Sequence, residues 1–225
     1  MVIEDLFCAY GKTSVLRGVD LRVDPGEAVG LVGRNGAGKT TTLRAISGVV
    51  PRRSGRITFG GKPLPDRPRH VAGAGIAHVP EGRGLIGALT AEENLRVAGY
   101  GAGHPVDEDT LRDVVDVFPR LQGILDRRAD VLSGGEQQMV ALARALVAKA
   151  SLVLIDELSL GLAPIVVDGA WQALLQLRER DGLSLLVVDQ NLGLIQKYCD
   201  TVYLLRDGVT RTFDSPEGSA IDSVY

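Results

Sequence analysis

The chain has 225 residues, 45% of them hydrophobic and 24% charged, which are ordinary values for a globular protein. This length allows one large domain, or a core with a subdomain. A formal net charge of −3 gives no general attraction to nucleic acid, so we expect no nucleic-acid partner. The two cysteines, Cys8 and Cys199, lie far apart in the sequence, which favours a reducing compartment without a disulfide framework.

The sequence contains no segment that predicts passage through a membrane. Its start, Met1-Val2-Ile3-Glu4-Asp5, lacks the basic and apolar regions of a signal peptide. Apolar runs such as residues 152–155 and 185–188 have the length of strands, whereas a membrane span needs about 20 apolar residues. We therefore expect a cytoplasmic protein that reaches a membrane through a partner.

Strand patterns dominate the first part of the chain. Apolar alternation and flanking turn signals predict strands at residues 2–10, 15–23, 28–32, 56–59 and 75–79. The third of these strands is apolar throughout and follows the turn signal Asp24-Pro25-Gly26-Glu27. A helix is expected soon after it, at residues 41–46.

A glycine-rich loop between this third strand and the helix fits the phosphate-binding template of Gly, four residues, then Gly-Lys-Ser/Thr. Glycines let successive backbone N–H groups turn towards one anion, and the helix N-terminus adds partial positive charge. We expect Lys39 to contact the β- and γ-phosphates of a nucleoside triphosphate and Thr40 to bind Mg²⁺. The predicted nucleotide-binding residues of the loop are Gly33, Arg34, Asn35, Gly36, Ala37, Gly38, Lys39, Thr40 and Thr41.

The middle of the chain, residues 82 to about 131, predicts helices without two-sided apolar strands. We interpret this stretch as a helical subdomain. Thr90 and Glu93 form a capping-box pattern that opens a helix to about Ala98. Residues 99–105 are expected to form a loop.

Helices alternate with apolar strands in the last part of the chain. The expected helices are residues 133–150, 166–180 and 192–199, and the expected strands are 152–155, 184–188, 201–205 and 209–213. Asp207-Gly208 is a hairpin turn between the last two strands. The pattern predicts an α/β fold: a mainly parallel sheet flanked by helices, with an N-terminal antiparallel β part and the helical subdomain.

Two carboxylates, Asp156 and Glu157, follow the apolar strand at 152–155. In an open α/β sheet, this end of a strand lines the ligand crevice. We expect Asp156 to hold Mg²⁺, directly or through water. Glu157 is expected to polarise the attacking water as a general base.

A second helix start carries the motif Leu132-Ser133-Gly134-Gly135-Glu136-Gln137-Gln138. Ser133 and Glu136 form another capping box, and the two glycines leave the backbone open to close approach. One nucleotide cannot easily use this helix N-terminus and the phosphate loop within one small domain. A plain helix cap explains Ser133 and Glu136, but neither the paired glycines nor the glutamines.

The full motif resembles the signature of ABC-type ATPases, and nearly the whole chain resembles an ABC transporter nucleotide-binding subunit. The resemblance implies a single ABC ATPase domain, residues 1–225, whose ATP-binding core is 1–81 and 132–225. It implies two ATPase subunits, of the same or of different chains, packed head to tail with two ATP molecules between them. Mg²⁺ and ATP are the implied cofactors.

The resemblance also assigns further nucleotide-binding residues. Tyr10 matches the aromatic residue that stacks on adenine, although a strand tyrosine without a ligand is the alternative. The residues expected to bind the ATP held by the partner's phosphate loop are Ser133, Gly134, Gly135 and Gln137.

Further motifs resemble the ATPase subunits of branched-chain amino acid importers, and relatives serving urea or short amides look similar. These motifs are Val79-Pro80-Glu81-Gly82-Arg83, residues 89–95, residues 159–164 and Val188-Asp189-Gln190-Asn191. Such a subunit lies on the inner face of the cell membrane and contacts two membrane permease subunits through the Glu81 loop and the helical subdomain. A periplasmic or extracellular substrate-binding protein is an indirect partner. A lipopolysaccharide exporter subunit, a non-transport ABC ATPase and a phosphoryl-transfer enzyme are the alternatives.

Three positions depart from the wider family pattern. Glu81 stands where Gln usually serves as Mg²⁺ ligand and sensor; it can bind the metal but cannot donate an amide hydrogen bond, and a solvated loop acid is the alternative. Gln190 replaces the switch histidine; it can donate to the γ-phosphate but cannot become cationic. Leu158 replaces a proline. We expect Glu157, Lys39 and Gln190 to support turnover together.

Overall fold

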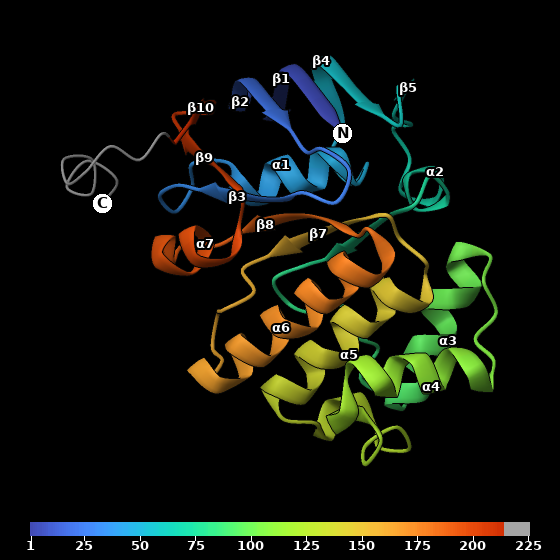
Figure 1. Cartoon of the computed structure of the whole chain (residues 1–225). Coiled ribbons are helices and arrows are strands. Elements are labelled where there is room, and N and C mark those ends of the chain that lie inside the picture. The colour runs from blue at the N-terminus through green and yellow to red at the C-terminus, as the bar shows by residue number, and fades with distance from the viewer. Residues whose placement is uncertain (214–225) are drawn as a thin grey trace.

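The computed structural model describes residues 1–213 and has the α/β architecture that the sequence predicts. An antiparallel sheet lies above a larger sheet, and most helices pack beneath the larger one (Figure 1). Residues 214–225, the end of the predicted domain, lie outside the described residues.

The upper sheet has the strand order β2-β1-β4-β5. Its strands are β1 (Val2–Tyr10), β2 (Thr13–Arg22), β4 (Arg52–Phe59) and β5 (Lys62–Pro63). The N-terminal antiparallel part is confirmed, but β4 begins at Arg52 rather than at residue 56, and β5 has no predicted counterpart. Arg52 and Ser54 belong to the strand because they pair with β1, although no apolar alternation marks them.

The larger sheet has the strand order β10-β9-β3-β8-β7-β6, and every neighbouring pair except the hairpin β9–β10 is parallel. This confirms the mainly parallel sheet. Its strands are β3 (Ala28–Val32), β6 (Ile76–Val79), β7 (Leu152–Asp156), β8 (Ser184–Val188), β9 (Thr201–Arg206) and β10 (Val209–Thr212).

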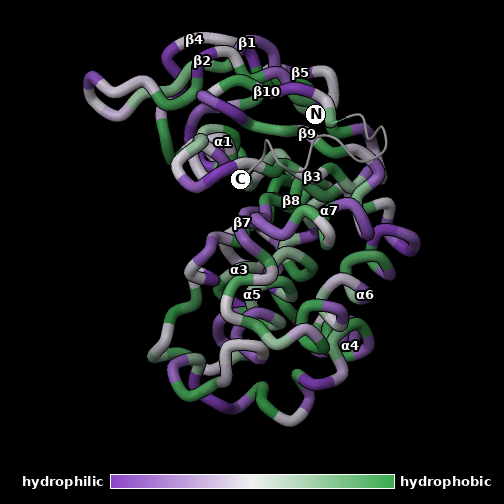
Figure 2. The backbone as a smooth tube through the Cα atoms, turned by 90° about the vertical axis from the view of Figure 1, so that its left-hand side faces the viewer, coloured by the Kyte–Doolittle hydropathy of each residue, from purple (hydrophilic) through white to green (hydrophobic). Residues whose placement is uncertain are grey.

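Both faces of this sheet are covered. Helices α5 (Gly134–Val147), α6 (Pro164–Asp181) and α7 (Leu192–Tyr198) lie on one face, whereas α1 (Lys39–Ile46) lies between the two sheets (Figure 1). Alternate residues of β7 and β8 join opposite apolar clusters: Val153 packs with the α5–α6 side, and Leu154 with α1 and the antiparallel sheet. All residues of β3 and β8 are buried, and the tube in Figure 2 is mainly hydrophobic in colour at these strands.

From α2 to the start of α5 the chain is helical apart from the strand β6 and the connecting loops. Its elements are α2 (Pro68–Gly73), α3 (Ala91–Ala102), α4 (Glu108–Val117) and two short 3₁₀ turns (Pro119–Leu121 and Ala129–Val131). The position of the subdomain at residues 82–131 stays a prediction. Among residues 1–213, no helix is both long and apolar enough to cross a membrane.

The predicted loop at 99–105 is wrong in its first part, because α3 continues to Ala102. Gly99 is not a helix breaker here. A Cβ at this position would lie 2.4 Å from the carbonyl oxygen of His104, so glycine allows the returning chain to pack against the helix. Gly103, with φ 82°, ends the helix instead.

The partly buried His78 on β6 gives a test of the pH dependence of stability. Burial, with a smaller contribution from the charge of Arg44, lowers the pKa of His78 to about 4, and its Nδ1 lies 3.1 Å from Ser47 Oγ. In the unfolded chain the His78 imidazole takes up a proton as pH falls through 6.5, whereas in the folded chain it stays neutral down to about pH 4. The free energy of unfolding is therefore highest above pH 6.5 and decreases as pH falls towards 4.

Between neutral pH and pH 4, the free energy of unfolding of wild type should fall because of His78. We expect this fall to be smaller by about 3 kcal/mol in His78→Gln. Denaturant unfolding of both proteins across this pH range measures it. The exposed His104 supplies the matched control, His104→Gln, which should keep the wild-type slope. Equal slopes for His78→Gln and wild type would contradict the assignment.

Candidate functional site

The glycine-rich loop connects the fully buried strand β3 to α1. Gly36 and Gly38 adopt left-handed φ angles of 80° and 112°. A Cβ on Gly38 would also lie 2.6 Å from Leu16 Cδ2, so both conformation and space require glycine there. The tight approach of β2 thus holds the loop in a shape that presents backbone N–H groups.

The start of α1 is electropositive. Its first turn contains no acidic residue, so the partial positive charge of the helix N-terminus is uncompensated within the helix. Lys39 is buried, and its Nζ donates to the carbonyl oxygens of Gly33 at 2.9 Å and Arg34 at 3.3 Å. The ammonium group is therefore folded over the loop, where an anion cradled by the loop would meet it.

A cavity of about 530 Å³ adjoins this loop and brings several predicted residues together. Glu81, Glu157 and Gln190 line it. The loop and helix residues in its lining are Asn35, Gly36, Gly38, Lys39, Thr40 and Thr41. Four segments that are distant in the sequence therefore meet at the carboxyl end of the parallel strands, where α/β sheets bind ligands.

Asp156 is 2% exposed and contacts Thr40, a residue of the cavity lining. The Thr40 hydroxyl donates to its Oδ1 at 3.2 Å. Burial raises the pKa of the Asp156 carboxyl, and the charges of Glu157 and Glu81 raise it further, whereas the hydrogen bond from Thr40 lowers it. The negative charges of Glu157 and Glu81 act on Asp156, so a cation bound at Asp156 would offset their repulsion.

This donor set fits Mg²⁺. The ion needs few protein ligands, since it usually keeps several waters and takes the rest from one or two carboxylates and substrate phosphates. The described residues contain no cluster of three or more His, Cys, Asp or Glu side chains that could hold a metal alone. Thr40 and Asp156 would hold the ion together with the nucleotide.

Replacement of Asp156 by Asn gives a prediction for the nucleotide-free protein. A raised carboxyl pKa means that stability is lost as pH rises from the ordinary value of 3.8 through the raised value. Asp156→Asn keeps an oxygen acceptor for Thr40 without a buried charge, so we expect a higher unfolding temperature near neutral pH, and little difference at acid pH. The control is Asp126→Asn, at an exposed position. A lower unfolding temperature near neutral pH would show that Asp156 stabilises the empty site.

Glu157 and Gln190 form a hydrogen-bonded pair. Gln190 Nε2 donates to Glu157 Oε1 at 2.7 Å. The backbone of Glu157 has φ 54°, which a residue with a Cβ rarely adopts, and its N–H donates to the carbonyl oxygen of Val188 at 2.8 Å. Leu158, at the position of the family proline, turns its side chain into the core and is fully buried. The strained turn therefore directs Glu157 towards the cavity while the next residue anchors it.

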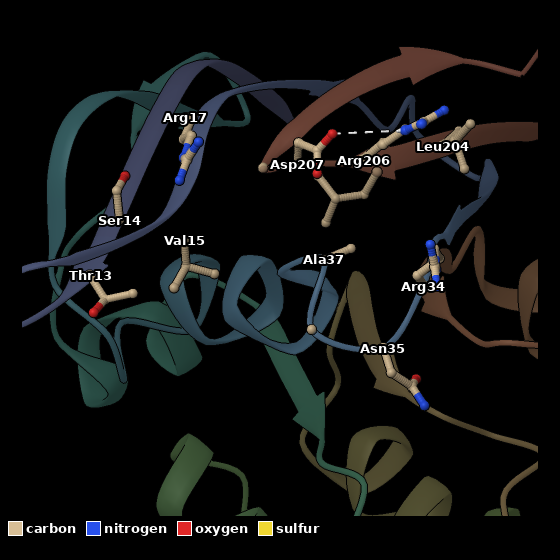
Figure 3. Close-up of a pocket in the computed structure, with 13 residues that line it drawn as sticks. Thr13, Ser14, Val15, Arg17, Arg34, Asn35, Ala37, Leu204, Arg206 and Asp207 are labelled. Atoms are coloured by element: carbon tan, nitrogen blue, oxygen red, sulfur yellow. Dashed lines mark ion pairs between the residues drawn. The ribbon is translucent and has the colours of Figure 1, made fainter. Parts of the chain in front are cut away.

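A second cavity, of about 570 Å³, lies on the other side of the loop. Figure 3 shows Val15 and Arg17 of β2 on one side, Arg34 and Ala37 of the loop on the other, and the ion-paired Arg206 and Asp207 closing it. Its lining shares Val15, Asn35 and Gly36 with the first cavity, so the two spaces adjoin.

Tyr10 lies at the end of β1, where it pairs with Thr13, another residue of this second cavity. Its side chain is 46% exposed, and it is absent from the lining of both cavities. The structure thus places Tyr10 next to a residue of the second cavity, and its role in binding adenine stays a prediction.

The Ser133 motif begins α5, and both hydrogen bonds of the capping box are present. Gln137 is held within the chain: its Oε1 accepts from Arg83 at 2.8 Å and its Nε2 donates to the carbonyl oxygen of Ala129 at 2.8 Å. Gly135 leaves space for α6, since a Cβ there would lie 2.9 Å from Val166 Cγ1. None of the residues Ser133, Gly134, Gly135 or Gln137 lines either cavity beside the phosphate loop.

Sequence reasoning missed three residues of the site. Val15 and Leu160 line the first cavity, and Asp189 hydrogen-bonds Ser159 next to it. Val15 reads only as a strand residue, and Leu160 lies in the motif at residues 159–164 without an assigned role in nucleotide binding. The sequence does contain a sign of Asp189, because this carboxylate directly follows the buried strand β8. Glu157 follows the buried strand β7 in the same way.

Comparison with known families shows the family of this chain. A family model described as ABC transporter matches residues 16–159, a span that includes the phosphate loop, the Ser133 motif and the acidic pair. The chain belongs to the ABC transporter family. It is an ATP-binding subunit of an ABC transporter, and it hydrolyses ATP.

Relatives of this ABC ATPase subunit include importers and exporters. It is 41% identical over 200 residues to the high-affinity branched-chain amino acid transport ATP-binding protein BraG of Pseudomonas aeruginosa, covering 88% of this chain and 85% of BraG. It is 34% identical to the probable branched-chain amino acid transport protein LivF of Archaeoglobus fulgidus, covering 90% and 86%. The lipopolysaccharide export protein LptB of Escherichia coli K12 is 32% identical, covering 92% and 87%.

Solved structures share the fold of the ABC ATPase subunit. An ATP-binding subunit of an ABC transporter is 31% identical, with a TM-score of 0.82, and the match covers 95% of this chain and 90% of that one. The dimeric ABC transporter cassette MJ0796 is 22% identical, with a TM-score of 0.81 and coverage of 96% and 99%. The second likeness supports the fold alone.

Proposed function

We propose that this subunit binds Mg-ATP at the phosphate loop and hydrolyses it to drive import of branched-chain amino acids. It acts at the cytoplasmic face of the cell membrane, with a second ATPase subunit of the same or a different chain and two membrane permease subunits. A periplasmic or extracellular binding protein delivers the cargo to the permeases. The observation that carries the catalytic part is the Glu157–Gln190 pair, which lines the same cavity as Lys39 and Thr40.

Each of these residues has a defined role in the proposed reaction. Lys39 and the loop N–H groups neutralise the β- and γ-phosphates, and Thr40 and Asp156 hold Mg²⁺, with Glu81 as a further carboxylate beside it. Glu157 accepts a proton from a water molecule that attacks the γ-phosphorus, and ADP leaves as its bond to that phosphorus breaks. Gln190 orients Glu157 and donates to the γ-phosphate. The adenine base of ATP extends along the second cavity towards Tyr10.

Two subunits are needed because one chain leaves the Ser133 motif unused. The capped N-terminus of α5, with Gly134 beside it, presents backbone donors away from the two loop cavities of its own chain. A head-to-tail pair brings this N-terminus of one subunit to the γ-phosphate held by the other. The solved cassette MJ0796, which shares this fold, is described as dimeric.

A groove of about 410 Å³ between the Glu81 side of the core and α3 is the proposed contact with the permease subunits. Apolar side chains stand exposed around it: Val49 is 58% exposed, Val97 44%, and Tyr100 on the same helix 83%. His78 Nε2, Arg83 Nε and Arg144 Nε are buried and have no hydrogen-bond partner in the part of the chain that the structure describes, and all three residues line the groove. An apolar segment that also carries acceptors would satisfy both features.

The cargo assignment rests on the greater identity to BraG, 41%, than to LptB proteins, 32–33%. Reconstitution of the subunit with its co-purified membrane partners in vesicles would test it, with labelled leucine, isoleucine, valine and urea as cargo. We expect ATP-dependent uptake of the amino acids, lost with Glu157→Gln. ATP-driven uptake of urea alone, or ATP-driven extraction of lipopolysaccharide without uptake, would contradict the assignment.

A further inference from the structure

One buried carboxylate connects the loop that carries Glu157 with the loop that carries Gln190. Asp189 directly follows β8 and is 3% exposed. Its Oδ2 accepts from the Ser159 N–H at 3.0 Å. Its Oδ1 accepts from the Ser159 hydroxyl at 2.8 Å and from the Asn191 N–H at 2.9 Å. The carboxylate thus receives donors from both loops at once.

These contacts lie next to the pair that faces the phosphate loop. Ser159 is two residues after Glu157, and Asp189 directly precedes Gln190, while Gln190 Nε2 and Glu157 Oε1 are 2.7 Å apart. The left-handed backbone of Glu157, φ 54°, persists only where its surroundings hold it. Two hydrogen bonds to Ser159 fix the chain on the C-terminal side of that turn.

The loop after β8 is itself anchored. Asn191 Oδ1 accepts from the Leu194 N–H and so begins α7. Helix α7 packs tightly on β3, because a Cβ on Gly30 would lie 2.2 Å from Ile195 Cγ2. Asp189 therefore joins the strained Glu157 turn to a segment that cannot shift easily.

We propose that Asp189 is a positioning residue for ATP hydrolysis, which holds Glu157 and Gln190 in the relative placement that proton transfer from water requires. Asp189 is absent from the lining of the cavity and acts through Glu157. The inference rests on the proposed roles of Glu157 and Gln190. A displacement of about 1 Å in such a group costs on the order of 10²-fold in rate.

The test compares Asp189→Ala in two backgrounds, with Mg-ATP hydrolysis and binding of a fluorescent ATP analogue as readouts. In the wild-type background we expect kcat to fall about 10- to 100-fold, with KM and analogue affinity changed less than about threefold. In the Glu157→Gln background we expect no further loss, because a residue that acts through Glu157 has nothing left to position. An equal fold-loss in both backgrounds, or a loss of ATP affinity matching that of kcat, would overturn the proposal.

Asp189→Asn keeps the size of the side chain, and it provides the second variant if Asp189→Ala does not fold. Its amide NH₂ would face the Ser159 N–H, so we expect a similar loss of kcat. Asp168→Asn is the matched control, since Asp168 accepts from Tyr198 and Lys197 on the α6–α7 surface and lines neither loop cavity. Wild-type kcat in Asp189→Asn would contradict the positioning role.

The outcomes also separate this inference from the proposed function. If Glu157→Gln hydrolyses ATP as fast as wild type, the role proposed for Glu157 fails. If Glu157→Gln is inactive and Asp189→Ala matches Asp168→Asn, only the role of Asp189 fails.

Discussion

Glu157→Gln is expected to lower kcat for ATP hydrolysis by about 10²- to 10⁴-fold, the range that a general base contributes. The amide keeps the shape of the side chain and the oxygen that accepts from Gln190 at 2.7 Å, but it cannot take a proton. Binding of Mg-ATP should persist, since Lys39 and the loop are untouched. Steady-state release of phosphate measures the rate, and an ATP analogue measures binding.

Glu179→Gln is the matched control for this variant. Glu179 lies exposed near the end of α6, away from the cavity lining, so wild-type turnover is expected. Wild-type turnover in Glu157→Gln would instead show that another group accepts the proton, and the next carboxylate of the cavity to replace is then Glu81.

Lys39→Ala is expected to weaken ATP binding by on the order of 10²-fold, from the loss of charged hydrogen bonds to two phosphates. Among residues 1–213, the Lys39 Nζ, now held by the carbonyl oxygens of Gly33 and Arg34, is the only side-chain cation in the lining of the first cavity. Hydrolysis should be lost as well. Titration with a fluorescent ATP analogue gives the affinity directly.

Because Lys39 is buried, the binding experiment needs a stability measurement beside it. The unfolding temperature without nucleotide shows whether the loop still folds, and Lys62→Ala, at an exposed position of β5, serves as the control. A folded Lys39→Ala protein with wild-type affinity would mean that backbone N–H groups alone hold the phosphates.

Much of the fold could be predicted because its signals are local. Fully apolar strands such as β7 and β8, and the capping boxes at Thr90 and Ser133, each specify an element from a few neighbouring residues. The errors fall where a long-range contact decides. Arg52 enters a strand through pairing with β1, and Gly99 stays in a helix because His104 packs against it.

The candidate site follows the same division. The phosphate loop and the acidic pair lie within short motifs, so their residues could be named in advance, and Thr40 and Asp156 do meet at 3.2 Å. The hydrogen bond between Gln190 and Glu157, and the link made by Asp189, join segments about 30 residues apart. Sequence periodicity could not predict these two contacts, because the order of the strands in the sheet determines which loops become neighbours.

The proposed role of the Ser133 motif requires a second subunit, because the motif is expected to bind the ATP held by that subunit. The decisive measurement is the mass of Glu157→Gln protein by light scattering, without and with Mg-ATP, alone and mixed with any second ATPase subunit that co-purifies with it. We expect the mass of one chain without nucleotide and of two ATPase chains with Mg-ATP. A protein that binds Mg-ATP yet keeps the mass of a single chain in every mixture would contradict a nucleotide site shared between two subunits.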